Sequence, residues 1–420
     1  MTDKFHYRCN DCQAEYPAGK AMYLCPSCQD KNSPDQPPLG VLKVIYDYDS
    51  ILSSFLGKAP FDALAGDDFL PLLPIHKLSS LPMLRVGNTP IYKIMESNEK
   101  GDSFEVFLKD DSQNPTFSFK DRASAIVSAW AKENGIHTIV AASTGNAGSS
   151  LAGICASQGQ QSVIFVPATA PIAKLTQIVM YGARIIPVAG TYDQAFDLSV
   201  EASLRFGLYN RNTAFNPFTI EGKKTVSFEL FSQLGKQLPD RVFVPVGDGV
   251  IISGVYKGFE DLLNLGIIER MPVIVAVQAA GSSNLIHNLN AEVFNALPST
   301  TLADSISVDI PRNFHMAAKY LKTYAGEWIT VTDLEILEAS LKLSRTAGIF
   351  SEPAAAAAFA GLLRYKSETR LINGSRNVVL LTGSGLKDLK SVQTLIDLPR
   401  AVQPDPSILD RIFTKTDFSA

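Results

Sequence analysis

The feature that most limits the fold of this chain is a repeated alternation of short apolar segments with longer segments of helical pattern, which begins near Phe104. The apolar segments, each short enough for one buried strand, are 104–109, 138–142, 162–167, 184–189, 242–246, 273–278 and 377–382. Between them apolar residues recur at helical spacing, as at Leu334, Leu337 and Leu341. Continuous apolar strands separated by helices are typical of parallel sheets covered on both faces. The sequence therefore predicts an α/β fold built on parallel sheets.

Composition and charge exclude several classes of protein. The chain has 420 residues, of which 46% are hydrophobic and 19% charged, a balance typical of a soluble globular protein with two or three domains. The net charge of −4 offers no basic surface, so we expect neither a nucleic-acid nor a membrane partner. The most apolar run, Ala354–Leu363, is about half a membrane span and predicts a buried helix. The N-terminal segment lacks the apolar core of a signal peptide, which predicts a cytoplasmic protein.

Four of the five cysteines form two Cys-x-x-Cys pairs near the N-terminus, Cys9 with Cys12 and Cys25 with Cys28. Disulfides are not expected in a reducing compartment, and two such pairs present four thiolates to one tetrahedral ion. They predict a structural Zn²⁺ in a ribbon that ends in a strand at 41–46; a redox pair, bound iron or no metal at all are the alternatives. The fifth, Cys155, is expected to be a small buried residue. The Pro-rich segment 49–100 is predicted to be irregular and to wrap the main body.

A lysine in the segment Asn114–Arg122 (NPTFSFKDR) has the environment of a reactive amine. Ser118 can cap a helix that runs to about Asn134, which places Lys120 in the first turn, where the helix dipole disfavours an ammonium. A lysine shifted towards its neutral form is suited to forming an imine with an aldehyde. A surface lysine paired with Asp121 is the alternative.

Three further motifs follow strands, where ligands of open α/β sheets bind. In 141–148 (AASTGNAG) small residues, hydroxyls and an amide can approach an anion. The glycine turn in 246–254 (VGDGVIISG) can hold a phosphate at a helix start, with Asp248 capping or facing away. In 381–388 (LTGSGLKD) Thr382 offers a neutral hydroxyl that we expect to be exposed. Each motif alone also fits a plain turn.

Together these motifs resemble the threonine synthase family, pyridoxal-phosphate enzymes of the tryptophan-synthase-β fold type, also called fold type II, over about residues 40–395. The resemblance implies that Lys120 holds pyridoxal 5'-phosphate as a Schiff base, that Asn146 bonds its ring hydroxyl and that Thr382 meets its ring nitrogen. The residues implied to cradle its phosphate are Gly247, Asp248, Gly249, Val250 and Ile251. Those matching the loop for the substrate α-carboxylate are Ser143, Thr144, Asn146 and Ala147.

The same resemblance implies a homodimer that acts on a small amino acid, and a division of the chain into domains. The zinc ribbon would occupy 1–48, the large cofactor-binding α/β domain 49–122 and 239–400, the small α/β domain 123–238, and a tail 401–420.

The chain departs from the family pattern where the substrate phosphate is held. Thr213 and Ala214 stand in place of Asn-Ser, Thr219 and Ser307 in place of arginines, and Ser384 in place of a histidine. Lys224 matches the lysine of the family's EGQKT. Basic residues that can replace the missing contacts are Lys174, Arg211, Lys223, Lys224 and Arg312.

Three functions follow from these observations. The first is a threonine synthase-like lyase that converts O-phosphohomoserine and water to threonine and phosphate. The missing phosphate contacts favour the second, a related serine or threonine dehydratase or a β-replacement enzyme for another small amino acid. The third is a zinc-ribbon binding protein with an inactive body, against which Lys120, Asn146 and Thr382 argue.

Overall fold

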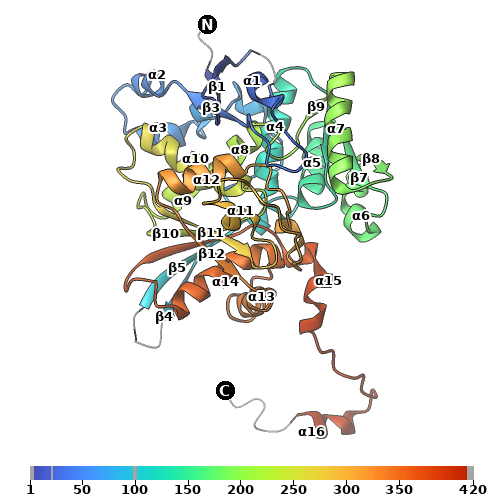
Figure 1. The fold of residues 1–420 in the computed structure, drawn as a ribbon. Coiled ribbons are helices and arrows are strands. Elements are labelled where there is room, and N and C mark those ends of the chain that lie inside the picture. The colour runs from blue at the N-terminus through green and yellow to red at the C-terminus, as the bar shows by residue number, and fades with distance from the viewer. Residues whose placement is uncertain (1–3, 20–21, 98–100, 102, 414–420) are drawn as a thin grey trace.

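The structure, a computed structural model, describes residues 4–19, 22–97, 101 and 103–413 and contains three sheets (Figure 1). The largest has six strands in the order β12-β11-β10-β13-β5-β4, parallel except for the edge strand β4. Its strands are β4 (Ile91–Ser97), β5 (Ser103–Asp110), β10 (Arg241–Pro245), β11 (Val273–Ala279), β12 (Glu327–Val331) and β13 (Arg376–Leu381).

The second sheet has four parallel strands in the order β8-β7-β6-β9. They are β6 (Thr138–Ala142), β7 (Gln161–Pro167), β8 (Arg184–Val188) and β9 (Tyr209–Asn210). Two parallel α/β sheets with an N-terminal cysteine module confirm the predicted fold class, whereas the exact domain boundaries stay predictions.

Helices connect the strands of both sheets. Those of the main body are α4 (Lys120–Glu133), α5 (Asn146–Gln158), α6 (Ile172–Met180), α7 (Tyr192–Phe206), α8 (Phe218–Lys223), α9 (Thr225–Gln233), α10 (Val250–Asn264), α11 (Asn284–Asn288), α12 (Phe314–Thr323), α13 (Asp333–Ala347) and α14 (Pro353–Ser367). The apolar run at 354–363 is the buried part of α14, as expected. None of the helices that the structure describes combines the length and hydrophobicity that crossing a bilayer needs.

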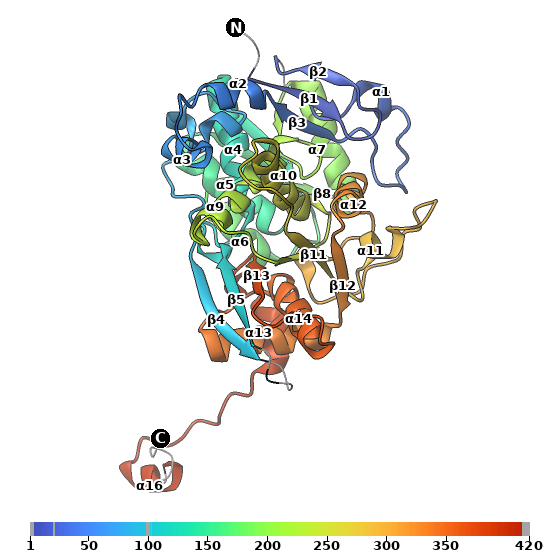
Figure 2. The ribbon, with the colours of Figure 1, turned by 90° about the vertical axis from the view of Figure 1, so that its left-hand side faces the viewer.

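The N-terminal module is a small antiparallel sheet of β1 (Phe5–Cys9), β2 (Glu15–Pro17) and β3 (Leu42–Tyr46), with the short helix α1 (Pro26–Gln29). In both views it lies at the opposite end of the molecule from the C-terminal segment (Figure 2). That segment runs through α15 (Leu389–Val392) and then extends away from the body to α16 (Leu409–Ile412).

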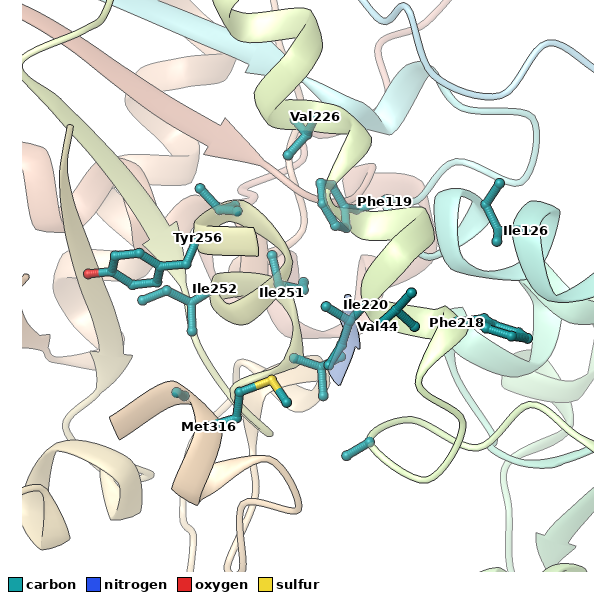
Figure 3. Packing of buried hydrophobic residues seen from close by; sticks show 14 of the residues in the cluster. Val44, Phe119, Ile126, Phe218, Ile220, Val226, Ile251, Ile252, Tyr256 and Met316 are labelled. Atoms are coloured by element: carbon teal, nitrogen blue, oxygen red, sulfur yellow. The ribbon is translucent and has the colours of Figure 1, made fainter. Parts of the chain in front are cut away.

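A shared hydrophobic core fixes the elements that surround the cavity described below. Figure 3 shows Phe119, Ile220 and Ile251 in one cluster with Val44 of the N-terminal module. Phe119 immediately precedes Lys120, Ile220 lies on α8, and Ile251 lies in the first turn of α10. Close packing of these side chains holds three segments, far apart in sequence, in one arrangement.

One expectation is wrong in part, and the helix predicted around residues 334–341 is confirmed with another face buried. The segment 49–100 is not irregular, because it contains α2 (Tyr48–Ser53, beginning one residue earlier), α3 (Pro60–Gly66) and the strand β4. The buried face of α13 is formed by Ile336, Ala339 and Leu343, whereas Leu334 is 64% exposed. Both sets have helical spacing, and the faces differ because α13 packs against α14 on one side only.

Candidate active site

A cavity of about 510 Å³ lies where strands of both large sheets end. Its lining begins directly after β6, β9 and β10, and residues 304–310 close another side. Most of the predicted site residues line it, namely Lys120, Ser143, Thr144, Asn146, Ala147, Gly247, Asp248, Gly249, Val250 and Ile251. Segments separated by more than a hundred residues therefore meet at one edge of the two sheets, which is where ligands of open α/β sheets bind.

Lys120 is the first residue of α4, and its amide donates to the Ser118 hydroxyl at 3.1 Å. Burial lowers the pKa of its ammonium, and the neighbouring Arg211 lowers it further against the opposing effect of Glu352. Asp121 is not its partner, because that carboxylate accepts from the Thr116 amide at 2.7 Å and from the Thr116 hydroxyl. Lys120 is thus a partly buried amine that faces the cavity, not a surface lysine in an ion pair.

Asn146, at the start of α5, has a partner that the sequence did not indicate. Its amide donates to both carboxylate oxygens of Glu352, at 2.9 and 3.0 Å, and to the Ser305 hydroxyl at 3.2 Å. Glu352 is buried, and burial raises its pKa against the opposing effects of Asn146 and Lys120. The Glu352 carboxylate therefore binds the Asn146 amide and also interacts electrostatically with Lys120.

Glu352 lies outside the four motifs of the sequence, directly before the proline that begins α14. Its side chain also explains a glycine in the last motif, since a Cβ at Gly383 would lie 2.3 Å from a Glu352 oxygen. Glycine at this position lets the carboxylate reach Asn146.

The loop before α10 has the geometry of an anion cradle. Gly249 has a φ of +85°, and a Cβ at Gly247 would lie 2.9 Å from the Ile306 backbone. The first N–H groups of a helix have no partner within it, so those of α10 are free to meet an anion. Asp248 behaves as expected: its carboxylate accepts from the Arg312 amide at 3.2 Å and its carbonyl from the Asn313 amide at 3.0 Å.

Thr382 lies beside Lys120 but is not exposed, contrary to expectation. Its carbonyl accepts from the Phe119 amide at 2.9 Å, and its residue surface is 3% accessible. It does not belong to the lining of the cavity. The turn after β13 is covered because Ser118 and Ser351 pair with Gly383 and Ser384 on its two sides.

The positions that depart from the family pattern have different surroundings. Ser307 lines the cavity, whereas the hydroxyl of Thr219 is buried and donates to the Asn216 carbonyl at 2.8 Å. Ser384 accepts from the Leu386 amide with its hydroxyl at 3.3 Å, and Ala214 has a φ of +61°. The fifth, Thr213, lines the cavity and accepts from the guanidinium of Arg211, two residues earlier, at 3.2 Å.

The four N-terminal cysteines converge, with all their sulfur atoms within 4.8 Å of one another. The sulfurs of Cys9 and Cys28 are 3.8 Å apart, and those of Cys12 and Cys25 are 3.6 Å apart. A tetrahedral zinc–thiolate site with bonds of about 2.3 Å has sulfur–sulfur edges of about 3.8 Å, whereas a disulfide measures about 2.0 Å. The donor set fits a metal ion and not a disulfide pair. Cys155 is fully buried on α5, as expected.

Comparison with known proteins defines the class of enzyme. A family model described as pyridoxal-phosphate dependent enzyme matches residues 83–383. Among solved structures, a processed threonine deaminase isoform 2 from Solanum lycopersicum superposes with a TM-score of 0.63 at 21% identity, covering 90% of this chain and 98% of that chain. The diaminopropionate ammonia lyase of Escherichia coli gives a TM-score of 0.62 at 16% identity, over 75% of this chain and 89% of that chain. The fold is that of pyridoxal-phosphate-dependent enzymes of fold type II.

Relatives with similar sequences identify the family within this class of enzyme. The threonine synthase of Methanocaldococcus jannaschii is 33% identical over 96% of this chain and 98% of its own length. The threonine synthase of Methanosarcina acetivorans is also 33% identical, over 97% of this chain and 96% of its own length. The chain belongs to the threonine synthase family and is a pyridoxal-phosphate-dependent lyase of that type. Its cavity fits the cofactor, since a lysine amine of lowered pKa and a free helix N-terminus suit an aldehyde and a phosphate.

Proposed function

We propose that this enzyme converts O-phosphohomoserine and water to threonine and phosphate, with Lys120 holding pyridoxal phosphate. The observation that carries the proposal is the similarity to threonine synthases over nearly the whole chain, together with the cavity that unites the matching motifs. The cofactor, when bound, withdraws electrons from the substrate Cα and so acidifies its proton.

Each part of the cavity wall has a role in this proposal. Lys120, once the substrate amine has taken its place, is the base for the Cα proton. Residues 143–147 bind the substrate α-carboxylate, and residues 247–251 bind the cofactor phosphate. Glu352 holds the Asn146 amide through two hydrogen bonds and so orients it towards the cofactor ring. Thr382, which lies beside Lys120 just outside the cavity lining, would present a neutral group to the ring nitrogen, which suits elimination better than transamination.

The proposal extends to parts of the protein outside the cavity. The four cysteines hold a structural Zn²⁺, which has no open position for a substrate. The enzyme acts in the cytoplasm as a homodimer.

A dehydratase or β-replacement enzyme for another hydroxy-amino acid is the second candidate. It is favoured by Thr219, whose hydroxyl is bound to the Asn216 carbonyl just before α8 and cannot take the place of an arginine.

One assay separates the two functions. We expect the enzyme loaded with pyridoxal phosphate to release inorganic phosphate from O-phosphohomoserine and to form threonine in equal amount. Ammonia release from serine and threonine, measured beside it, should be slower by orders of magnitude. Ammonia release without any phosphate release would replace the proposal with the second candidate.

A further inference from the structure

Two of the five basic residues that the sequence offered as phosphate ligands differ from the rest in having no carboxylate partner. Lys174 pairs with Asp304 at 2.8 Å, and Arg312 pairs with Asp193. Lys224 pairs with Glu221 and with Asp261, in a buried cluster outside the cavity lining. Arg211 and Lys223 line the cavity, and in the described part of the chain neither forms an ion pair. Arg211 and Lys223 are therefore not neutralised by a carboxylate of the described residues.

Arg211 is fixed by neutral groups only. It follows β9, is 1% exposed, and donates from Nε to the Ser124 hydroxyl at 3.2 Å. Its terminal nitrogens meet the Thr213 hydroxyl at 3.2 Å and the Lys120 carbonyl at 3.5 Å. Burial lowers its pKa to about 10, which still leaves it charged near neutral pH. The guanidinium is thus held in place beside the first turn of α4 without being neutralised.

Lys223, the last residue of α8, is fully buried, and its ammonium has no hydrogen-bond partner in the described residues. Its stem lies against α10, where a Cβ at Gly254 would come within 2.6 Å of the Lys223 Cβ. Burial lowers its pKa, and the charges of Arg211 and Lys120 lower it further, with only Asp248 opposing them. The amine is therefore held at the cavity in a place where an additional negative charge would stabilise its protonated form.

Such an arrangement is costly in a protein that binds no anion. An unpaired buried cation loses its hydration without compensation, and structural cations are accordingly paired. Lys174, Lys224 and Arg312 follow that rule in this molecule. Two exceptions that line the same cavity indicate a ligand with at least one full negative charge there.

We propose that Arg211 and Lys223 together bind the anionic end of the substrate, in place of the arginines that the family pattern has at Thr219 and Ser307. That this end is a phosphate ester rests on the proposed function. The cofactor phosphate has its own cradle in the free N–H groups at the start of α10. The side chains of Arg211 and Lys223 can instead donate charge-assisted hydrogen bonds to a second anion, the one on the substrate.

The test uses the pyridoxal-phosphate-loaded enzyme and the single variants Arg211→Gln and Lys223→Gln. Lys174→Gln is the matched control, since it removes a nearby cation that already has a partner. Three quantities are measured: the affinity for inorganic phosphate by titration calorimetry, kcat/KM for O-phosphohomoserine, and the affinity for the cofactor by its absorbance. Thermal melting of each variant, with and without phosphate, shows that the protein is folded.

We expect each of the two variants to bind inorganic phosphate and to use O-phosphohomoserine at least about tenfold less well, as one lost charge-assisted contact requires. Cofactor affinity should stay within about twofold, and phosphate should stabilise the wild type and Lys174→Gln but not the two variants. If the wild type binds inorganic phosphate but never uses O-phosphohomoserine, and the two variants lose phosphate binding, the anion site is retained while the proposed function fails.

Two results overturn the inference. In the first, the variants use O-phosphohomoserine as well as the wild type does, which leaves the function intact and removes these residues from it. In the second, the variants lose the cofactor rather than inorganic phosphate, which assigns the two cations to the cofactor phosphate.

Discussion

At the scale of single residues, the cavity holds two lysines whose pKa values burial lowers, and only one of them stands at a helix start. A neutral amine is therefore not by itself enough to identify the residue that binds the cofactor. Lys120 combines the lowered pKa with a position between the loop 143–147 and the cradle 247–251. Lys223 lies at the far end of α8, packed against α10.

We predict that borohydride reduction of the loaded enzyme attaches the cofactor mass to the peptide that contains Lys120. Lys120→Ala should abolish both this label and the absorption band of the bound cofactor, because the other lysine of the cavity lining, Lys223, lies at the end of α8 and not at a helix start. Lys223→Gln is the matched control and should retain the label. A label on the Lys223 peptide of the wild type would reverse the two assignments.

The residues that the sequence identified lie in continuous motifs, whereas those it missed depend on contacts that form only in the folded chain. Lys120, Asn146 and the glycines before α10 belong to contiguous motifs, so their local geometry follows from neighbours in the chain. Glu352 lies 206 positions from Asn146, and its role comes from a contact that only the folded chain makes. The absence of a partner, which distinguishes Lys223 from Lys224, is likewise a property of three-dimensional surroundings.

At the scale of elements, all of the predicted strands except β8 have residues that are mostly buried. Their bounds agree with the structure to within one or two residues. The strands of the two large sheets that were not predicted, β4, β9 and β12, all lie at sheet edges. An edge strand has one side without a neighbour and can keep polar or exposed residues, as Glu327 and the exposed Trp328 show in β12. A search for continuous apolar runs misses edge strands of this kind, although it finds the edge strand β8, whose sequence is mostly apolar.

The two ends of α10 offer a test of the proposed cofactor cradle. Gly249 and Gly266 both have positive φ, at +85° and +64°, so alanine at either position strains the backbone by about 1–2 kcal/mol. At Gly249 the added Cβ would also lie 3.0 Å from the Ala317 Cβ, whereas at Gly266 it meets nothing within 4 Å. Gly249→Ala must therefore shift the loop.

We predict that Gly249→Ala weakens cofactor affinity by roughly tenfold, which corresponds to about 1.4 kcal/mol. Both variants should lower the melting temperature, because both strain the backbone. Gly266→Ala should leave the cofactor affinity unchanged, because it lies at the other end of the helix. Both affinities are measured by titrating the apoenzyme with pyridoxal phosphate. Equal cofactor affinity in the two variants would contradict a phosphate site at this helix start.

At the scale of the whole molecule, the N-terminal module is built into the enzyme rather than attached by a linker. Phe5 and Tyr7 of β1 pack their rings against Phe218, with centroids 5.7 and 6.0 Å apart. The Tyr46 hydroxyl at the end of β3 donates to Glu221 at 2.7 Å. All these contacts reach α8, the helix that ends in Lys223.

A second set of contacts reaches the preceding loop. Tyr23 stacks on Phe215 with centroids 4.5 Å apart, and its hydroxyl accepts from the Asn210 amide at 2.9 Å. Asn210 immediately precedes Arg211. The module therefore supports both of the unpaired cations, while Lys120 depends on α4 and the turn after β13.

We predict that replacing Cys9 and Cys28 together by serine releases zinc, because a four-thiolate site loses half of its ligands. Since structural zinc contributes folding energy, the melting temperature should fall by about 5 °C or more. The cofactor absorption band should remain, because Lys120 is held by α4 and by the turn after β13, whereas KM for O-phosphohomoserine should rise. Cys155→Ala, which removes a buried thiol outside the module, is the control and should retain zinc and KM. A soluble double variant that loses the cofactor band would show that the module also builds the surroundings of Lys120. A double variant with an unchanged KM would show that the contacts of the module to α8 and to Phe215 do not position Arg211 and Lys223.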